Sequence, residues 1–260
     1  MTNNTDLMAL ERQDRIVALV NGRGSITVLE LCAIFSVSEA TIRRDLVAVT
    51  EKKLIRRVHG GAMRIGEVAT SEAPIVQRQL ENPEIKAQIG QATVQLIRNG
   101  ETLLLLGGST GLAVARALHH HTDLTVATDS LLITRELLQQ GKHKLILLGG
   151  MIDPNEQAAR GTFSRLILQQ LHVDKVILGA KAIAIQRGVS TETPEEAELF
   201  RTCVECADHI IVVTDSSKFQ KSALAKVIPI ENIHTLVTDH RLEVSIVEHI
   251  RGLGIQLVLV

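Results

Sequence analysis

Residues 36–49, SVSEATIRRDLVAV, carry the pattern of an amphipathic helix. Ile42, Leu46 and Val49 follow one another at i, i+4 and i+7, so they fall on one face of a helix. Ser38 stands directly before this pattern, and serine is among the best helix N-cap residues. We therefore predict a helix from Ser38 to about residue 53. The opposite, solvent-facing side of this helix would carry Glu39, Arg43, Arg44 and Val47.

Two further helical patterns precede this stretch. The first runs from residue 11 to residue 20 and stops at a polar turn that contains glycine. Thr27 followed by Glu30 has the spacing of a capping box, so a second helix is expected to begin there. A tight turn at residues 36–38 joins it to the third helix. This arrangement predicts a helix-turn-helix over residues 26–45.

Residues 54–63, LIRRVHGGAM, combine β-branched and basic residues with a Gly-Gly turn, which is typical of a short hairpin. We therefore predict a winged helix-turn-helix domain over residues 9–64. Residues 1–66 hold ten Lys or Arg against seven Asp or Glu, whereas the rest of the chain is acidic. A local basic patch on an acidic protein indicates one nucleic-acid face, although a plain three-helix bundle with a solvated charged surface is the alternative. The residues expected to contact DNA are Ser38, Glu39, Thr41, Arg43, Arg44, Arg56, Arg57 and His59.

The pattern changes after a predicted linker at residues 65–82. Short apolar segments alternate with helical patterns from residue 83 onward, which is typical of a parallel sheet covered on both faces. The chain is therefore predicted to be an α/β protein with a larger, Rossmann-like domain at residues 83–260. The expected strands are 102–106, 124–127, 145–148, 175–178, 210–214, 235–238 and 256–259. The expected helices include 83–98, 111–119, 131–140, 163–171, 195–206 and 242–252.

Three polar segments directly follow predicted strands. GGST at residues 107–110 joins two glycines, which let the backbone approach a ligand, to a helix start, whose N–H groups can bind phosphate. Thr128–Ser130 and DSSKF at residues 215–219 follow other strands, and Lys218 could neutralise a phosphate. Because parallel strands meet at one edge of a sheet, these segments predict a shared pocket, unless they only cap tight turns. The expected effector-binding residues are Gly107, Gly108, Ser109, Thr110, Thr128, Asp129, Ser130, Asp215 and Lys218.

Composition narrows the classes of function. Aromatic residues make up only 2% of the 260 residues, which argues against base stacking on single-stranded nucleic acid. Three cysteines do not make a disulfide framework, and no apolar run is long enough for a membrane span, so a cytoplasmic protein is expected. No cofactor or metal is expected. Cys203 and Cys206 lack a second pair for zinc, and the histidines at 119–121 lie at a predicted helix end, where a cation is favourable.

The motifs, taken in order, resemble the DeoR/GlpR family of bacterial sugar-metabolism regulators. The resemblance implies a winged helix-turn-helix and a sensor domain similar to the ribose-5-phosphate isomerase fold. It also implies that residues 83–260 sense an effector and form oligomers, and that a phosphorylated sugar releases the repressor from DNA. This chain has Leu106 where many relatives carry an acid, Asp129 where they carry Asn, and Lys181 where they often carry Asp. The segments that carry the resemblance are ERQDRI (11–16), SVSEATIRRDL (36–46), RRVHGGA (56–62), ILLGG (146–150), DKVILGA (174–180), DSSKF (215–219) and LVTD (236–239).

Two classes of function remain open to such a chain. The first is a repressor of a carbohydrate-utilisation operon, with double-stranded operator DNA, a phosphorylated sugar and further copies of the chain as partners. The second is a sugar-phosphate isomerase-like enzyme with an accessory DNA-binding domain. A basic helix-turn-helix has no role in an isomerase, and Asp129 and Asp215 are acid/base candidates by position only. We therefore predict a regulator and no enzyme; sequence does not separate repressor from activator, or dimer from larger assembly.

Overall fold

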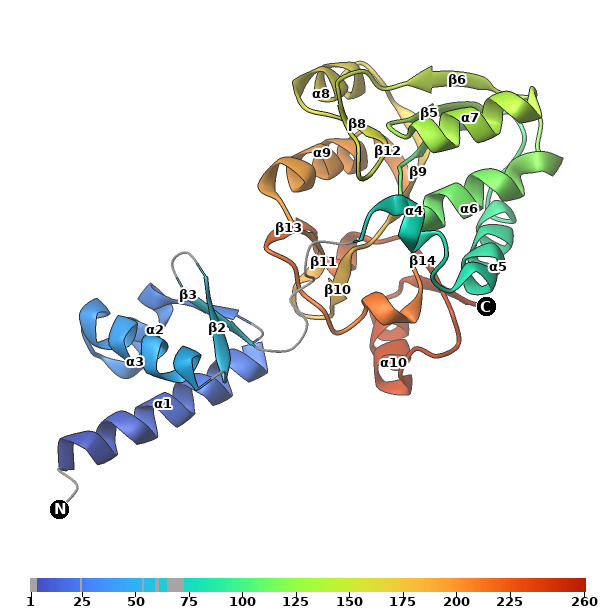
Figure 1. Ribbon diagram of the computed structural model, residues 1–260. Helices are drawn as coiled ribbons and strands as arrows, with labels where there is room; N and C mark the ends of the chain where they lie inside the picture. The colour runs from blue at the N-terminus through green and yellow to red at the C-terminus, as the bar shows by residue number, and fades with distance from the viewer. Residues whose placement is uncertain (1–3, 24, 53, 59–60, 65–72) are drawn as a thin grey trace. The chain divides into compact units, whose positions relative to one another are not determined.

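The computed structural model describes residues 4–23, 25–52, 54–58, 61–64 and 73–260 (Figure 1). The chain divides into two compact units, Met1–Thr70 and Ser71–Val260. The boundary falls inside the segment that the sequence suggests as a linker. Each unit has its own apolar core, so each is described by itself.

The first unit has the elements of a winged helix-turn-helix. Its three helices are α1 (Asn4–Arg23), α2 (Val28–Phe35) and α3 (Glu39–Glu51). Strands β1 (Ser25–Thr27), β2 (Ile55–Val58) and β3 (Gly61–Arg64) form an antiparallel sheet in the order β1-β3-β2. The predicted helices and hairpin are present, although α1 is longer than the pattern at residues 11–20. The core is formed by Ile16, Val20, Ile26, Val28, Leu31, Ile42, Leu46, Val49, Ile55 and Ala62.

Local side chains fix the turns of this unit. The Thr27 hydroxyl accepts the N–H of Glu30, and the Glu30 carboxylate accepts the N–H of Thr27, which completes the predicted capping box. Ser36 ends α2 in the left-handed region at φ 53°, and Ser38 caps α3. Gly61 is required where β3 passes β1, because a Cβ there would lie 2.3 Å from the Ile26 carbonyl oxygen. Helix α3 therefore starts at a residue that its own N-cap defines.

A buried carboxylate joins α1 to α3. Asp45 is 3% exposed and accepts hydrogen bonds from Arg12 Nε at 2.6 Å and Gln13 Nε2 at 3.1 Å. A buried charge is tolerated only where it is paired and hydrogen-bonded. The contact orients the α3 core face and leaves the opposite face to solvent.

The second unit is built on a seven-stranded parallel sheet in the order β15-β14-β12-β9-β4-β5-β6. Every neighbouring pair in it is parallel, as expected from apolar strands that alternate with helices. The predicted α/β class is confirmed. The strands are β4 (Thr102–Leu105), β5 (Thr125–Thr128), β6 (Lys144–Leu147), β9 (Val173–Gly179), β12 (Ala207–Val213), β14 (Thr235–Thr238) and β15 (Gln256–Leu259).

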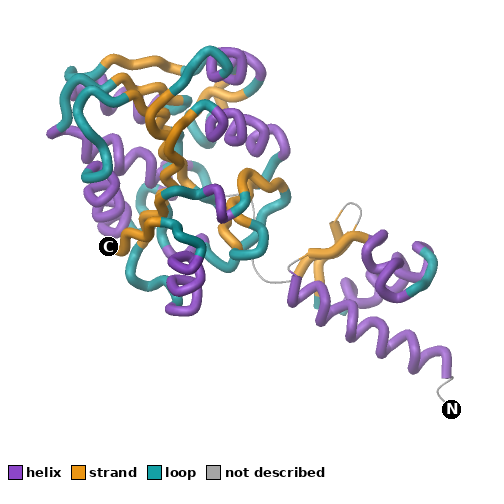
Figure 2. Tube along the Cα trace, turned by 180° about the vertical axis from the view of Figure 1, so that it is seen from behind, coloured by secondary structure: helices purple, strands orange, loops and turns teal. Residues whose placement is uncertain are grey.

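Helices cover both faces of this sheet (Figures 1 and 2). One face packs against α5 (Pro83–Val94), α6 (Ser109–Ala117) and α7 (Leu131–Gln140). The other packs against α8 (Thr162–Leu168), α9 (Pro194–Glu205) and α10 (Val244–Gly252). Short 3₁₀ turns lie at η1 (Leu118–His120), η2 (Ser216–Lys218) and η3 (Ile230–Asn232). None of the helices in the described part of the chain has the length and apolar character needed to cross a bilayer.

Several short elements have no counterpart among the predicted ones. A hairpin of β7 (Met151–Asp153) and β8 (Ala158–Arg160) follows β6. A small antiparallel sheet joins β10 (Ala182–Ala184), β11 (Gly188–Thr191) and β13 (Ala225–Ile228). Helix α4 (Ile75–Arg78) lies within the stretch suggested as a linker, but its Ile75 is fully buried and donates its N–H to the Asn155 carbonyl at 2.9 Å. Residues 73–82 thus belong to the second unit by their packing.

Candidate effector site and DNA interface

The exposed face of α3 carries the residues suggested for DNA contact. Arg43 and Arg44 are exposed, and Arg43 pairs with Glu39 one turn earlier at 3.0 Å. Ser38 Oγ accepts the Thr41 N–H at 3.3 Å and lies 3.0 Å from Thr41 Oγ1, so both hydroxyls sit at the helix start. An exposed pair such as Arg43–Glu39 is weak and can be exchanged for a phosphate.

The other suggested DNA contacts lie on the hairpin. Arg56 and Arg57 are in β2, opposite Met63 and Ala62 of β3. His59 lies outside the described residues. The structure therefore positions α3 and β2 as adjacent basic elements of one unit, with α3 in contact with β2.

A polar cavity opens in the second unit beyond the carboxyl ends of β4, β9 and β12. Gly107, Gly108, Ser109 and Thr110 form one wall of it, as the loop that leads from β4 into α6. Gly108 has φ 121°, a conformation that suits glycine. Among the described residues no side chain caps α6, so its first N–H groups remain available to an anion. Asp215 and Lys218 also line the cavity.

The cavity is also lined by two cationic side chains, Lys86 and Arg78, which lie outside the three suggested segments. Lys86 of α5 is 5% exposed and its ammonium donates to the carbonyls of Arg78 and Glu81, the latter at 2.7 Å. Burial lowers the pKa of Lys86, and nearby Asp215 and Glu81 partly oppose this effect. Arg78 donates to the Ala73 carbonyl at 2.8 Å and forms an ion pair with Glu156. The cavity thus holds several cations fixed by buried contacts.

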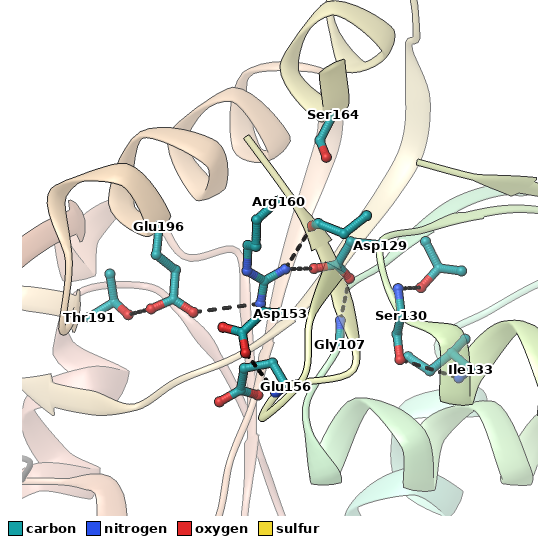
Figure 3. A network of polar contacts seen from close by, with 12 residues as sticks. Gly107, Asp129, Ser130, Ile133, Asp153, Glu156, Arg160, Ser164, Thr191 and Glu196 are labelled. Atoms are coloured by element: carbon teal, nitrogen blue, oxygen red, sulfur yellow. Dashed lines mark hydrogen bonds and ion pairs between the residues drawn. The ribbon is translucent and has the colours of Figure 1, made fainter. Parts of the chain in front are cut away.

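A network of buried ion pairs stands behind the Gly107–Thr110 loop (Figure 3). Asp129 is fully buried; its Oδ1 accepts the Gly107 N–H at 2.7 Å and its Oδ2 pairs with Arg160. Burial by itself would lower the pKa of the Arg160 guanidinium, but Asp129 and Glu196 outweigh that effect and the pKa is raised. Glu196 lies 3.8 Å from Arg160 and also accepts the Thr191 hydroxyl. The loop backbone is therefore fixed by charge pairs.

The suggested effector residues divide into two groups. Gly107, Gly108, Ser109, Thr110, Asp215 and Lys218 line one cavity. Thr128, Asp129 and Ser130 are fully buried and do not line it. Thr128 Oγ1 accepts the Ser130 N–H at 3.1 Å, and Ser130 Oγ accepts the Ile133 N–H at 3.3 Å, so these two hydroxyls shape the start of α7.

The loop that carries Lys218 is held by two aspartates. Asp215 Oδ1 accepts the Ser217 N–H at 3.0 Å. Asp239, which follows β14, accepts the Ser216 N–H at 2.7 Å and the Ser216 hydroxyl at 2.9 Å. Burial would raise the pKa of Asp239, but hydrogen bonds from Arg241 and Ser216 outweigh it and hold the pKa at about 2.

A second cavity of about 340 Å³ adjoins the first. Glu156, Arg160, Lys181 and Glu196 line both. Lys181 lies 3.2 Å from Glu196 and 3.7 Å from Glu156, so it bridges the two carboxylates. Further carboxylates in the second cavity are Asp153, Glu192, Glu195 and Glu198.

The residues that sequence reasoning missed come from three places. Lys86 lies inside a helix, Arg78 in the suggested linker, and Arg160 in an unpredicted hairpin. The sequence offers one signal for the charge network: Lys181 and Asp129 both depart from the pattern of the family. In the structure each of them has a partner of opposite charge: Asp129 pairs with Arg160, and Lys181 lies between Glu196 and Glu156.

A helix-turn-helix unit followed by an α/β unit with a polar, charge-lined cavity defines a ligand-responsive DNA-binding regulator. The family model described as DeoR C terminal sensor domain matches residues 81–240, and the one described as DeoR-like helix-turn-helix domain matches residues 12–68. The chain belongs to the DeoR family of transcriptional regulators, and it is a regulator rather than an enzyme.

Similar proteins span nearly the whole chain. A putative aga operon transcriptional repressor of Escherichia coli O157:H7 is 34% identical over 96% of this chain and 93% of its own. The glycerol-3-phosphate regulon repressor of Escherichia coli K12 is 31% identical over 96% of this chain and 98% of its own.

Among solved structures, a ribose 5-phosphate isomerase A from Methanocaldococcus jannaschii aligns with TM-score 0.39 and 16% identity, over 54% of this chain and 55% of its own.

Proposed function

We propose that this protein is a cytoplasmic repressor of a carbohydrate-utilisation operon, and that a phosphorylated sugar bound in the cavity of the second unit releases it from operator DNA. Both relatives described above are named as repressors. One of them is named for the regulon of glycerol-3-phosphate, a phosphorylated polyol. These names support the class of effector, and the cavity supplies the physical argument.

The phosphate would bind where α6 begins. The first N–H groups of α6 have no side-chain cap, and they lie at a cavity that is lined by Lys86, Lys218 and Arg78. This arrangement is the main support for the proposal. Helix N-termini and fixed ammonium groups are the donors that bind phosphate in proteins. The N–H of Gly107 would not bind the phosphate, since it is already given to Asp129, and a Cβ at Gly107 would lie only 3.3 Å from Asp129 Oδ1.

The sugar itself would extend into the adjoining cavity. Carboxylates such as Glu192 and Glu195 accept hydrogen bonds from hydroxyl groups. Lys181 and Arg160, both paired with Glu196, are placed between the two cavities and can donate to ring or hydroxyl oxygens. A phosphate at one end and several hydroxyls at the other is the chemistry of a sugar phosphate.

DNA recognition would rest on the exposed side of α3. Arg43 and Arg44 are adjacent and diverge by about 100° around the helix, so one can reach a base edge while the other meets a phosphate. Ser38 and Thr41, with the helix N-terminus, would donate to the DNA backbone, while Glu39 would change its partner when Arg43 binds. Arg56, Arg57 and His59 would contact phosphates from the wing.

The signal would pass through the residues that follow the linker. Arg78, Glu81 and Lys86 line the cavity, and they come from the start of the second unit. A ligand phosphate that attracts Arg78 and Lys86 would compete with Glu156 and with the carbonyls they now bind. The position of α4 would then depend on occupancy of the cavity, as a two-state response requires.

The test is fluorescence anisotropy of the full-length protein on labelled DNA from upstream of its own gene and neighbouring operons. Unlabelled random DNA serves as competitor, and a panel of sugar phosphates and the matching unphosphorylated sugars is added afterwards. Competitor-resistant binding that one sugar phosphate reverses, and its free sugar does not, is the expected result. Specific binding that no sugar phosphate reverses would reject the effector assignment. Binding should also weaken steeply with salt, by about 0.9 log units per log unit for each phosphate contact.

A further inference from the structure

Exposed apolar side chains gather at one end of the sheet of the second unit. They come from β6, from β7, which follows it, and from α7 and α8, which cover opposite faces of the sheet. Figure 1 shows β6, α7 and α8 at the same end of the second unit. A hydrogen bond supports this placement: Ser164 of α8 donates its hydroxyl to the Gly149 carbonyl, in the turn after β6, at 2.6 Å. We call this set the β6-edge patch; its members are Leu138, Leu147, Met151, Ile152, Phe163 and Leu166, which are 41–82% exposed.

The strand at the centre of this patch is the open edge of the sheet. Among the strands of the described residues, β6 pairs with β5 alone, and the N–H groups of Lys144 and Leu148 donate to the carbonyls of Leu124 and Thr128 at 2.9 and 2.8 Å. Because backbone groups alternate along a strand, the N–H groups of Leu145 and Leu147 point away from β5. Proteins usually protect such an edge with proline, a bulge or several charges. β6 reads KLIL and has only Lys144 at its start.

We propose that a second copy of this chain docks on the β6-edge patch, with the two β6 strands paired antiparallel about a two-fold axis. An edge strand is its own complement in this arrangement, so one patch serves both copies. Centring the axis on Ile146 sets Leu145 opposite Leu147 of the second copy, so the outward backbone groups of both residues can bond. Lys144 then lies opposite Leu148 of the second copy, and like charges do not meet.

The size of the patch fits a stable dimer. Six large apolar side chains that are this exposed present on the order of 500 Å² of apolar surface. A standard interface buries roughly 800 Å² on each partner, including its polar rim. The largest apolar patch on a soluble protein is roughly 300–600 Å² and is often a functional surface, and the exposed apolar side chains at the β6 edge fall in this range.

The DNA-binding unit gives a reason why the occupant is a second copy. Each chain has one recognition helix, α3, and helix-turn-helix proteins bind operators of two half-sites as symmetric dimers. The other sheet edge exposes fewer large apolar side chains: among the described residues of β15 every apolar side chain is at least partly buried, and its neighbour α10 exposes Val244 at its start and Leu253 at its C-cap. The pairing proposed here is independent of which ligand the cavity binds.

The first experiment measures the oligomeric state of the full chain by size-exclusion chromatography with light scattering. Phe163→Glu and Leu147→Lys each place a charge in the patch, and Val244→Glu and Leu224→Lys place the same charges at exposed apolar positions elsewhere. We expect the wild type and both controls to be dimers or larger at tens of micromolar. Each patch variant should weaken self-association by about 100-fold while far-UV circular dichroism stays unchanged.

Hydrogen exchange then tests the strand pairing itself. The outward amides of Leu145 and Leu147 should be protected in the wild type and exchange at least about ten-fold faster in Phe163→Glu, which leaves β6 unaltered. A monomeric wild type would overturn the proposal. A dimer that survives both patch variants, or in which these two amides exchange freely, would overturn it as well and place the interface elsewhere.

Discussion

Lys218 offers a test at the scale of one residue. Lys218 lines the cavity at the carboxyl end of β12, and it lies in the second unit, outside the DNA-binding unit. Lys218→Met should weaken binding of the releasing sugar phosphate by about 10- to 100-fold, because a charge-assisted hydrogen bond contributes roughly 1.5–3 kcal/mol. Isothermal titration calorimetry measures this effect.

The matched control is Lys226→Met, which removes an exposed ammonium from β13 outside the cavity. It should leave effector affinity unchanged. DNA affinity without effector should be unaltered in both variants. Equal effector affinity for Lys218→Met and wild type would remove Lys218 from the phosphate site.

The low pKa of Asp239 predicts that the free energy of unfolding falls in acid. Its pKa is about 2 in the folded protein against 3.8 for an ordinary aspartate, because the hydrogen bonds from Arg241 and Ser216 outweigh burial. The folded state therefore binds fewer protons than the unfolded state between these values. The stability from Asp239 is fully present above pH 4 and is lost as the pH falls through about 2.

Urea unfolding at pH 4.5, 3.5 and 2.5 measures this contribution. The free energy of unfolding should fall less over this range in Asp239→Asn than in the wild type. Asp123→Asn, at an exposed position where asparagine tolerates the positive φ of 59°, is the control and should follow the wild type. A wild-type slope in Asp239→Asn would show that the carboxylate is not held ionised by the fold.

At the scale of elements, α4 is the connection between the cavity and the start of the second unit. Arg78 holds α4 through the Ala73 carbonyl and Glu156. Arg78→Ala should raise hydrogen exchange of residues 75–80 by about ten-fold or more, because a buried ion pair and a hydrogen bond are lost together. It should also reduce the change in DNA affinity that the sugar phosphate causes.

Gln77→Ala is the control for this element. Gln77 lies on the exposed side of α4, so exchange and effector response should stay as in the wild type. If Arg78→Ala binds effector less tightly yet responds fully at saturation, Arg78 serves the ligand alone and α4 does not transmit the signal. Both measurements on one variant thus separate binding from coupling.

The parallel strands and their helices could be predicted from the sequence because the strands are apolar runs and the segments between them carry helical patterns. In the first unit, Thr27 and Ser38 are N-caps visible in the sequence and present in the structure. The hairpin β7/β8 could not be found this way, because Met151 and Ile152 are exposed and carry no burial pattern.

The cavity was predictable only in part, for a related reason. Strand ends such as Gly107–Thr110 can be located once the strands are known. Arg78, Lys86 and Arg160 reach the same cavity from a helix turn, a long helix and a hairpin. Their convergence depends on tertiary packing that a single sequence does not display. Asp129 does follow its strand as expected, but it faces Arg160 and Gly107 rather than the cavity.

At the scale of the whole molecule, the two units separate DNA contact from ligand contact. Basic residues concentrate in the first unit, and the second carries the charge-lined cavities. In the proposed function the effector would change DNA affinity from a cavity whose lining residues all belong to the second unit. Such a response is a coupling free energy between two distinct sites, and coupling of this kind is reciprocal.

Reciprocity gives the last prediction. If a saturating sugar phosphate weakens operator binding by a given factor, operator DNA must weaken binding of that sugar phosphate by the same factor. A typical coupling of 1–3 kcal/mol corresponds to about 5- to 150-fold. Calorimetric titration of the sugar phosphate into free protein and into protein saturated with operator DNA gives one factor, and anisotropy with and without the ligand gives the other. A scrambled duplex of the same length is the control and should leave sugar-phosphate affinity unchanged. Unequal factors would mean that the ligand acts through a step other than the two-state equilibrium. A change of assembly at the β6 edge would be such a step. Repeating both titrations with Phe163→Glu would then show whether the inequality depends on dimer formation.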